Sequence, residues 1–390
     1  MKKFLLLIAV VLLVAFTLPT VILAESATED YKQSQTYLLL EDFIQNNPDR
    51  TTTANEQATA NYLANKFAEF GYNNSQIALQ RVPFEVNGYE TVNVVVHKDN
   101  STTTESIVIG AHFDSVGEGA NDNASGIVAL LQIARAIKNV DLPFDVYFVA
   151  FGGEEQGLYG SQYFVQNFSR DKMLPLTSIR LMINIDSIAN GDNLYVHCEN
   201  KQTELANFIL QNKVGNATLL EKPHAVGVFN ADVWGYGYYE DIQGSDHTPF
   251  RVEGIPVASF FSGNFKNWSY VESVNPQNNT LNTSLDVLSK CNQGWIDKID
   301  TVSSTVIATV INGQFDQVST NARNDLTKLN VWYNFTWPKI IAVVIIALLA
   351  LFAVLFYRKL QKQALMNTAQ ANTTHVFETP SADDIFTFKD

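Results

Sequence analysis

The feature that most constrains the fold is a series of three short apolar runs, each rich in β-branched residues and each followed by histidine or acidic side chains. The runs cover residues 106–113, 144–151 and 179–185. Runs of this length without alternating polar residues are typical of strands that are buried on both faces. Between the first two runs, apolar residues at 127–137 follow helical spacing. The pattern predicts an α/β fold built on a parallel sheet.

The remaining elements are expected from similar patterns along the chain. Apolar periodicity or alternation predicts helices at 26–49, 52–71, 203–213 and 285–320, and strands at 76–86, 90–97, 193–198 and 255–261.

The polar residues that follow the three runs form the candidate site. In an open α/β sheet, ligands bind beyond the carboxyl ends of the strands. One histidine and five carboxylates are expected at that edge: His112, Asp114, Asp122, Glu154, Glu155 and Asp186. So many negative charges would repel one another without a cation. The sequence therefore predicts a metal site, with room for two ions.

Each of these signals is modest when it is taken alone. Asp122 lies in Gly-Ala-Asn-Asp-Asn-Ala-Ser-Gly at 119–126, where an aspartate commonly serves as a helix N-cap. Glu154 and Glu155 are adjacent and point in different directions, so one can bind a metal while the other faces the reacting water. His247 lies in Ser-Asp-His-Thr-Pro-Phe, at another expected helix start. The order of the motifs along the chain is more specific than any single motif.

That order resembles the co-catalytic two-zinc aminopeptidases, a family that includes secreted bacterial leucyl aminopeptidases, aminopeptidase Y and glutamate carboxypeptidases. The resemblance covers about residues 90–261. It implies a three-layer α/β sandwich with a mixed, mostly parallel central sheet between helices. It also implies two Zn2+ ions as cofactors, with peptides that have a free N-terminus as substrates.

The same resemblance implies a role for each site residue. His112 and Asp186 would bind one zinc ion, Glu155 and His247 the other, and Asp122 would bridge the two. Glu154 matches the general base. Asp114 matches the residue beside the first histidine. Residues 282–286, Asn-Thr-Ser-Leu-Asp, are only a loose counterpart of a family segment that carries a histidine.

The implied chemistry is hydrolysis by a hydroxide that bridges the two metals. Two zinc ions and three carboxylate ligands leave one positive charge, which the hydroxide neutralises. Zinc lowers the pKa of bound water to about 7, and Glu154 would accept the proton of that water. The first interpretation is therefore an aminopeptidase. A carboxypeptidase or dipeptidase on the same scaffold, a glutaminyl cyclase, and a catalytically inactive, receptor-like ectodomain are the alternatives.

The ends of the chain predict export and a membrane anchor. Residues 1–24 read as a signal peptide, with two lysines before an apolar run. Residues 25–330 would form the extracellular peptidase domain and 331–339 a juxtamembrane segment. Residues 340–357 are uninterruptedly apolar and would span roughly 27 Å as a transmembrane helix. Basic residues follow, so 358–390 would be a cytoplasmic tail.

Charge and cysteine content set further limits. A net charge of −14 and a pI near 4.9 argue against a nucleic-acid partner. The two cysteines, Cys198 and Cys291, could pair in an exported domain or remain two buried thiols. The aromatic-rich stretch at 223–241 either lines a substrate pocket or is a covered surface loop.

Overall fold

The computed structural model describes residues 30–51, 53–83, 90–100, 103–191, 193–198, 203–221, 245–263, 280–313, 345–349 and 351–362. The chain divides into two units, Met1–Thr327 and Lys328–Asp390. The predicted signal peptide, the juxtamembrane segment and the aromatic-rich stretch at 223–241 lie outside the described residues.

The first unit is built on an eight-stranded mixed sheet. In spatial order its strands are β1 (Ile77–Pro83), β2 (Glu90–Lys98), β4 (Asp145–Phe151), β3 (Ser106–His112), β5 (Ile179–Ile185), β8 (Val257–Gly263), β6 (Asn193–Cys198) and β7 (Leu219–Glu221). Four of the seven pairings between these described strands are parallel, including β4–β3, β3–β5 and β5–β8. The three apolar runs are thus confirmed as neighbouring parallel strands, β4, β3 and β5.

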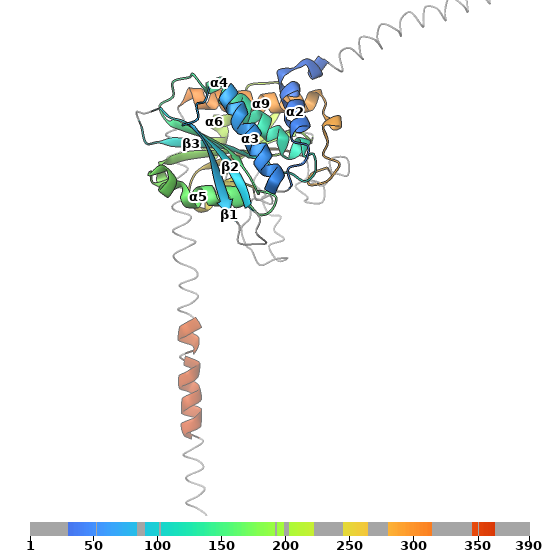
Figure 1. The fold of residues 1–390 in the computed structure, drawn as a ribbon. Coiled ribbons are helices and arrows are strands. Elements are labelled where there is room, and N and C mark those ends of the chain that lie inside the picture. Colours follow the sequence, from blue (N-terminus) through green and yellow to red (C-terminus); the bar gives the residue numbers. More distant parts are fainter. Residues whose placement is uncertain are drawn as a thin grey trace, which may run out of the picture. The chain divides into compact units, whose positions relative to one another are not determined.

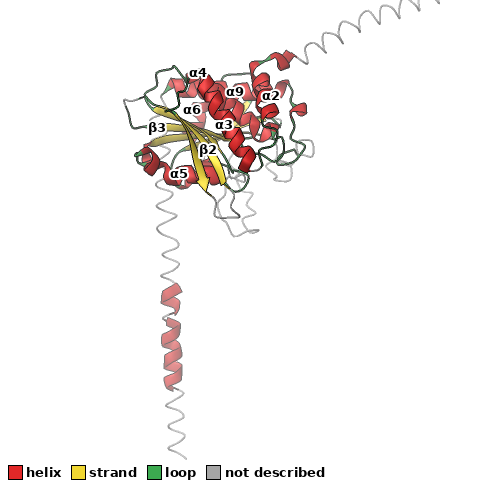
Figure 2. Ribbon diagram, viewed as in Figure 1, coloured by secondary structure: helices red, strands yellow, loops and turns green. Residues whose placement is uncertain are grey.

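Helices cover both faces of the sheet, which gives the predicted three-layer arrangement (Figure 1). One face carries α2 (Gln35–Asn46), α3 (Thr53–Glu69), α4 (Gly126–Ile137), α6 (Thr203–Gln211) and α9 (Gln293–Asn312). The other carries α5 (Tyr159–Lys172) and α7 (His247–Val252). Figure 2 shows the strands between the two groups of helices.

Side-chain alternation along the strands divides the core between the two faces. In β4, Phe148 and Ala150 join the core under α3 and α4, whereas Val149 and Phe151 join the core under α5. All seven residues of β3 and of β4 are buried. Burying each large apolar side chain contributes about 1.5–3 kcal/mol, and this two-sided burial explains why the sequence shows continuous apolar runs instead of alternation.

Two helices begin later than their apolar periodicity predicts, because a capping side chain fixes the start. Helix α2 begins at Gln35, where the Ser34 hydroxyl accepts the Tyr37 N–H at 3.1 Å. Helix α9 begins at Gln293, after the Asn292 side chain accepts the N–H groups of Gly294 and Trp295. Such caps satisfy the free N–H groups of a first helical turn. Among the described residues of each predicted helix before these starts, only Asp30–Gln33 and Leu288–Lys290 are helical, each as a short 3-10 helix.

The second unit contains helical residues at 345–349 and 351–362. Among the residues that are described, none of the helices combines the length and the apolar character needed to cross a membrane. The predicted span at 340–357 gains no support from this finding, and its residues 340–344 and 350 lie outside the description.

The two cysteines do not form a disulfide. Cys198 at the end of β6 and Cys291 before α9 are both free and buried. Of the two possibilities that the sequence left open, the structure has the pair of buried thiols. Burial raises the pKa of the Cys291 thiol to about 12, so this thiol is unreactive at neutral pH.

Candidate metal centre and active site

Parallel register brings the predicted ligands to one edge of the sheet. His112 is the last residue of β3 and pairs with Phe151, the last residue of β4. On the other side of β3, Gly110 pairs with Asn184 of β5, two residues before Asp186. Residues that follow each strand therefore leave the sheet at the same edge, as the sequence predicted.

The His112 ring is oriented by its own strand end. Its Nδ1 atom lies 3.1 Å from the main-chain oxygen of Asp114, which assigns the proton to Nδ1. Its Nε2 atom then faces two carboxylates, at 3.2 Å from Asp122 Oδ1 and 3.3 Å from Asp186 Oδ1. The three ligand atoms lie within 4.8 Å of one another, a spacing that could hold a metal ion. A ligand histidine whose second nitrogen donates to an oxygen is the usual arrangement in metal sites.

Two asparagines hold Asp122 beside the loop of Asp186. Asp122 lies in the π-helical segment η2 (Ala120–Ser125), and its peptide bond to Asn123 is cis. The Asn123 side chain accepts the Ser187 N–H at 3.1 Å and donates to the Ile185 oxygen at 2.9 Å. The Asn121 side chain accepts the N–H groups of Ala189 and Asn190 at 2.9 and 2.8 Å.

Asp122 is therefore a member of the cluster and not an N-cap. No side-chain capping bond is made at the start of η2 or of α4. The asparagines that flank Asp122 were not singled out in the sequence. The sequence signal that could have identified them is an asparagine on each side of a candidate metal-binding aspartate.

Glu154 and Glu155 lie in a turn directly after β4. The main-chain oxygen of Glu154 accepts the N–H groups of Gly157 and Leu158 at 2.8 and 2.9 Å. The Glu155 N–H donates to Asp114 Oδ2 at 2.9 Å, so Asp114 connects the two strand ends. Within the described residues, Glu155 Oε1 and Asp114 Oδ1 are buried and have no hydrogen-bond partner. Buried oxygens without partners are costly unless a cation or water satisfies them.

His247 begins α7, as predicted. Its Nδ1 atom lies 3.4 Å from the Asn184 side-chain nitrogen. Segment 245–247 reaches the cluster through Ser245, whose hydroxyl donates to Asp186 Oδ2 at 2.7 Å. Among the described residues, no group of three close ligand atoms includes Glu155 or His247. The second ligand set remains a prediction.

The electrostatics of the cluster favour the binding of a cation. Burial, and then the carboxylates Asp186, Asp246 and Asp114, raise the pKa of Glu154 to about 10, although His112 opposes this. Burial and Asp122 raise the pKa of Glu155 to about 8. Each of these carboxyl groups holds a proton at neutral pH, which a bound metal would displace. The donor set and these protonated, buried acids fit a divalent cation.

Asp246 is a further residue that the sequence did not single out, although it stands next to His247 in the quoted motif. Its side chain is fully buried, and burial raises the pKa of its carboxyl to about 7. Its charge acts on Glu154. A buried aspartate so close to the cluster adds one more acid to the site.

A second group with metal-ligand spacing is formed by His97, Asp99 and Asp145, but it lies at the opposite end of the sheet. His97 pairs with Tyr147, four residues before the end of β4 and about 13 Å along the strand. Its Nε2 atom contacts Asp145 Oδ2 at 2.9 Å and its ring stacks on Tyr147. This group is too distant to supply the second ion of the candidate site.

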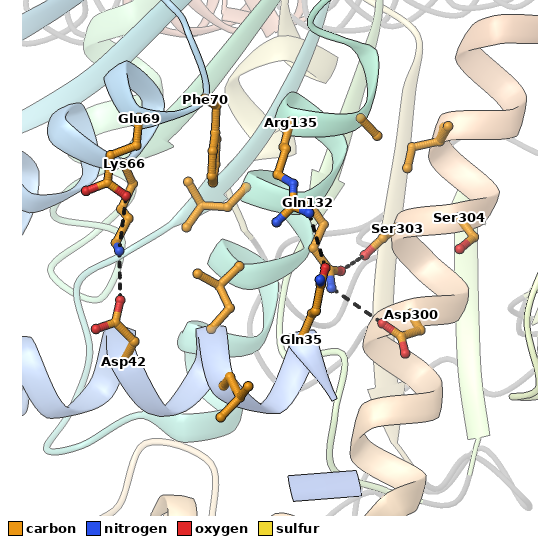
Figure 3. A pocket seen from close by; sticks show the side chains of 15 residues that line it. Gln35, Asp42, Lys66, Glu69, Phe70, Gln132, Arg135, Asp300, Ser303 and Ser304 are labelled. Carbon is orange, nitrogen blue, oxygen red and sulfur yellow. Dashed lines mark hydrogen bonds and ion pairs between the residues drawn. The ribbon is translucent and has the colours of Figure 1, made fainter. Parts of the chain in front are cut away.

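A cavity of about 690 Å3 lies among α2, α3, α4 and α9, on the helical face and not at the ligand edge (Figure 3). Its charged and polar groups pair with one another. Lys66 contacts Asp42 at 2.9 Å, Arg135 donates to Gln35 at 3.2 Å, and Ser303 donates to Gln132 at 2.5 Å. We therefore locate the chemistry at the sheet edge and not in this cavity.

Comparison with known proteins identifies the family of the chain. The model of peptidase family M28 matches residues 93–307, more than half of the chain. Aminopeptidase YwaD of Bacillus subtilis is 32% identical over 190 residues, which are 47% of this chain and 37% of that protein. The chain thus spans little more than a third of the length of this curated relative.

Two solved structures share the fold. The structure of BSAP, a zinc aminopeptidase from Bacillus subtilis, aligns with a TM-score of 0.54 and 17% identity, over 71% of this chain and 94% of that one. Porphyromonas gingivalis glutaminyl cyclase aligns with a TM-score of 0.50 and 22% identity, over 72% and 97%. At these identities the likeness concerns the fold alone.

Proposed function

This chain belongs to peptidase family M28, as the order of its motifs indicated, and we propose that it is a zinc-dependent aminopeptidase. Its substrates would be peptides with a free N-terminus. The observation that carries the proposal is the His112 ring, whose Nε2 atom faces Asp122 and Asp186 within 3.3 Å in a buried cluster of acids.

The residues at the sheet edge divide into ligands and reacting groups. We assign His112 and Asp186 to one zinc ion, Glu155 and His247 to a second, and Asp122 to both. A zinc ion held there would act as a Lewis acid and would lower the pKa of its bound water. Asp114 holds the site together, because its main-chain oxygen orients His112 and its carboxylate accepts the Glu155 N–H.

Glu154 is the proposed general base. The positive charge of a bound cation would lower the pKa of its carboxyl from the high value set by burial and neighbouring acids. The ionised carboxylate then accepts a proton from the attacking water and returns it to the leaving amine. The adjacent Glu155 cannot take this role while it acts as a ligand.

Three alternatives share the same scaffold. A carboxypeptidase or dipeptidase would use the same ligands and base, so only substrates separate it from an aminopeptidase. The glutaminyl cyclase fold is equally compatible with this architecture. A receptor-like ectodomain would have no use for a buried base, whereas Glu154 is present and lies among the acids of the cluster.

The decisive experiment compares two neighbouring glutamates. Glu154→Gln should keep the zinc content of the wild type but lower kcat by about 10²–10⁴-fold, the usual contribution of a general base. Its KM should change little, because the loss lies in the transition state. Glu155→Gln should lose zinc and activity together. Retention of most activity by Glu154→Gln would refute the assignment of the base. Zinc binding by the wild type without cleavage of any peptide would favour the receptor.

We also propose that the peptidase domain faces outward and is anchored by residues 340–357. This part of the proposal rests on sequence alone: the apolar run, the basic residues after it and the apolar N-terminus. Protease added to intact cells should digest the domain at 25–330 and spare an epitope tag at Asp390. Protection of the domain would contradict this topology.

A further inference from the structure

A fully buried arginine holds the segment that follows His112 and carries two further site residues, Asp114 and Asp122. Arg50, between α2 and α3, is 0% exposed. Its Nε donates to the Phe113 oxygen at 2.5 Å, its Nη1 to the Glu118 oxygen at 2.9 Å and its Nη2 to the Gly119 oxygen at 3.1 Å. All three acceptors belong to the connection between β3 and η2. That connection runs from His112 and Asp114 to Asp122.

A buried aspartate from the other end of the domain holds the same segment. Asp286, 1% exposed, lies before α9. Its carboxylate accepts the N–H groups of Asn121 and Asp122 at 2.9 and 2.8 Å. Nearby, the Leu288 N–H donates to the Glu118 carboxylate at 2.6 Å. The main chain of Asp122 itself is therefore a partner of Asp286.

The backbone between these two contacts has no spare room. Gly119 has a φ of +52°, and a Cβ atom there would lie 2.4 Å from the Asp122 oxygen and 2.8 Å from Arg50 Nη2. The segment between Arg50 and Asp122 is therefore tightly packed at Gly119.

We infer that Arg50 and Asp286 are positioning residues that hold segment 113–122 in its metal-binding geometry and so set the zinc affinity of the site. The inference rests on the proposed zinc site. It concerns binding of the metal, and it does not depend on which peptide is cleaved.

Geometry and charge make opposite predictions for Arg50. Among the described residues, no carboxylate lies within ion-pair distance of its guanidinium, and its partners are main-chain oxygens. If only its positive charge mattered, removing it would strengthen cation binding, because like charges repel. Its Nη1 also donates to the Asn47 oxygen at 3.0 Å. If the donation to the three oxygens of segment 113–122 matters, removal of Arg50 must weaken binding.

The test therefore uses variants that keep the charge and lose the geometry. In Arg50→Lys an ammonium group replaces the planar guanidinium and its several N–H donors. In Asp286→Glu the carboxylate moves by one methylene. Arg50→Met removes the charge as well. Zinc affinity of the full-length protein is measured by competition with a chromogenic chelator, and the urea midpoint is measured without zinc. Arg180→Lys, at the start of β5 near Glu105, is the matched control.

We expect Arg50→Lys, Arg50→Met and Asp286→Glu each to weaken zinc binding by about 10–100-fold, the usual cost of losing support for a ligand. Excess zinc should restore most of kcat, and Arg180→Lys should bind zinc like the wild type. Wild-type zinc affinity in both charge-conserving variants, with only a lower urea midpoint, would overturn the inference. Tighter binding by Arg50→Met would do the same. Normal zinc binding without peptide cleavage by the wild type would instead refute the proposed function alone.

Discussion

Glu56 is a buried acid whose ionisation should make the stability of this protein depend on pH. It lies in α3 and is 0% exposed. One carboxylate oxygen accepts a hydrogen bond from the Thr91 hydroxyl, and among the described residues the other oxygen, Oε1, has no partner. Burial, and then the nearby charge of Asp114, raise the pKa of Glu56 from 4.5 to about 8. We therefore expect Glu56→Gln to stabilise the protein at neutral and alkaline pH.

The size of the effect follows from the two pKa values. Between pH 4.5 and pH 8 the folded state keeps a proton on Glu56 that the unfolded state has lost. The contribution of Glu56 to stability therefore falls as pH rises, by about 1.4 kcal/mol for each pH unit. The whole window corresponds to at most about 5 kcal/mol. Glutamine cannot ionise, and its side-chain oxygen can still accept the Thr91 hydroxyl.

The assay is urea unfolding of wild type and Glu56→Gln at pH 5, 6, 7 and 8, with and without zinc. The difference in unfolding free energy should grow steadily in favour of the variant across this range. Thr91→Val should raise the pKa of Glu56 further, because the Thr91 hydrogen bond lowers it, and so extend the window to higher pH. A difference that stays constant from pH 5 to pH 8 would show that Glu56 titrates near 4.5, and the reasoning from burial would be wrong.

Three further predictions concern the loop, the metals and the thiols. Gly119→Ala should weaken zinc binding and lower the free energy of unfolding, because its Cβ would be crowded. Gly117 has a φ of +71° and its new Cβ would lie 3.7 Å from the nearest atom, so Gly117→Ala should lower the free energy of unfolding by only about 1–2 kcal/mol. Equal effects of the two variants in urea unfolding and zinc titration would contradict the crowding argument. Elemental analysis should find about two zinc ions per chain, and Asp122→Asn should lose both; loss of one ion only would show that Asp122 does not bridge. Reducing agent should leave Tm unchanged, because Cys198 and Cys291 are free; a lower Tm on reduction would indicate a disulfide.

The sequence by itself determined the sheet and the edge at which the candidate ligands gather. Strands buried on both faces are mostly apolar, so β3, β4 and β5 are visible as nearly continuous apolar runs. A polar residue at the end of such a run must lie at the sheet edge, which is why His112 and Asp186 could be predicted to meet. Asp122 lies in η2, directly before the helix that follows β3. Helix starts were less certain, because a capping residue such as Asn292 sets the boundary and not the apolar period.

Only the tertiary structure decided how that edge is held in place. Arg50 contacts residues 63 to 69 positions away, and Asp286 contacts residues 164 and 165 positions away. A single buried polar residue in a connection produces no periodic pattern, so its partners are set by the packing of α2, α3 and α9 against the sheet. The same holds for the cysteines, whose distance in space depends on the whole fold. Local patterns fix which side chains leave the strands, whereas long-range packing fixes the geometry in which they meet.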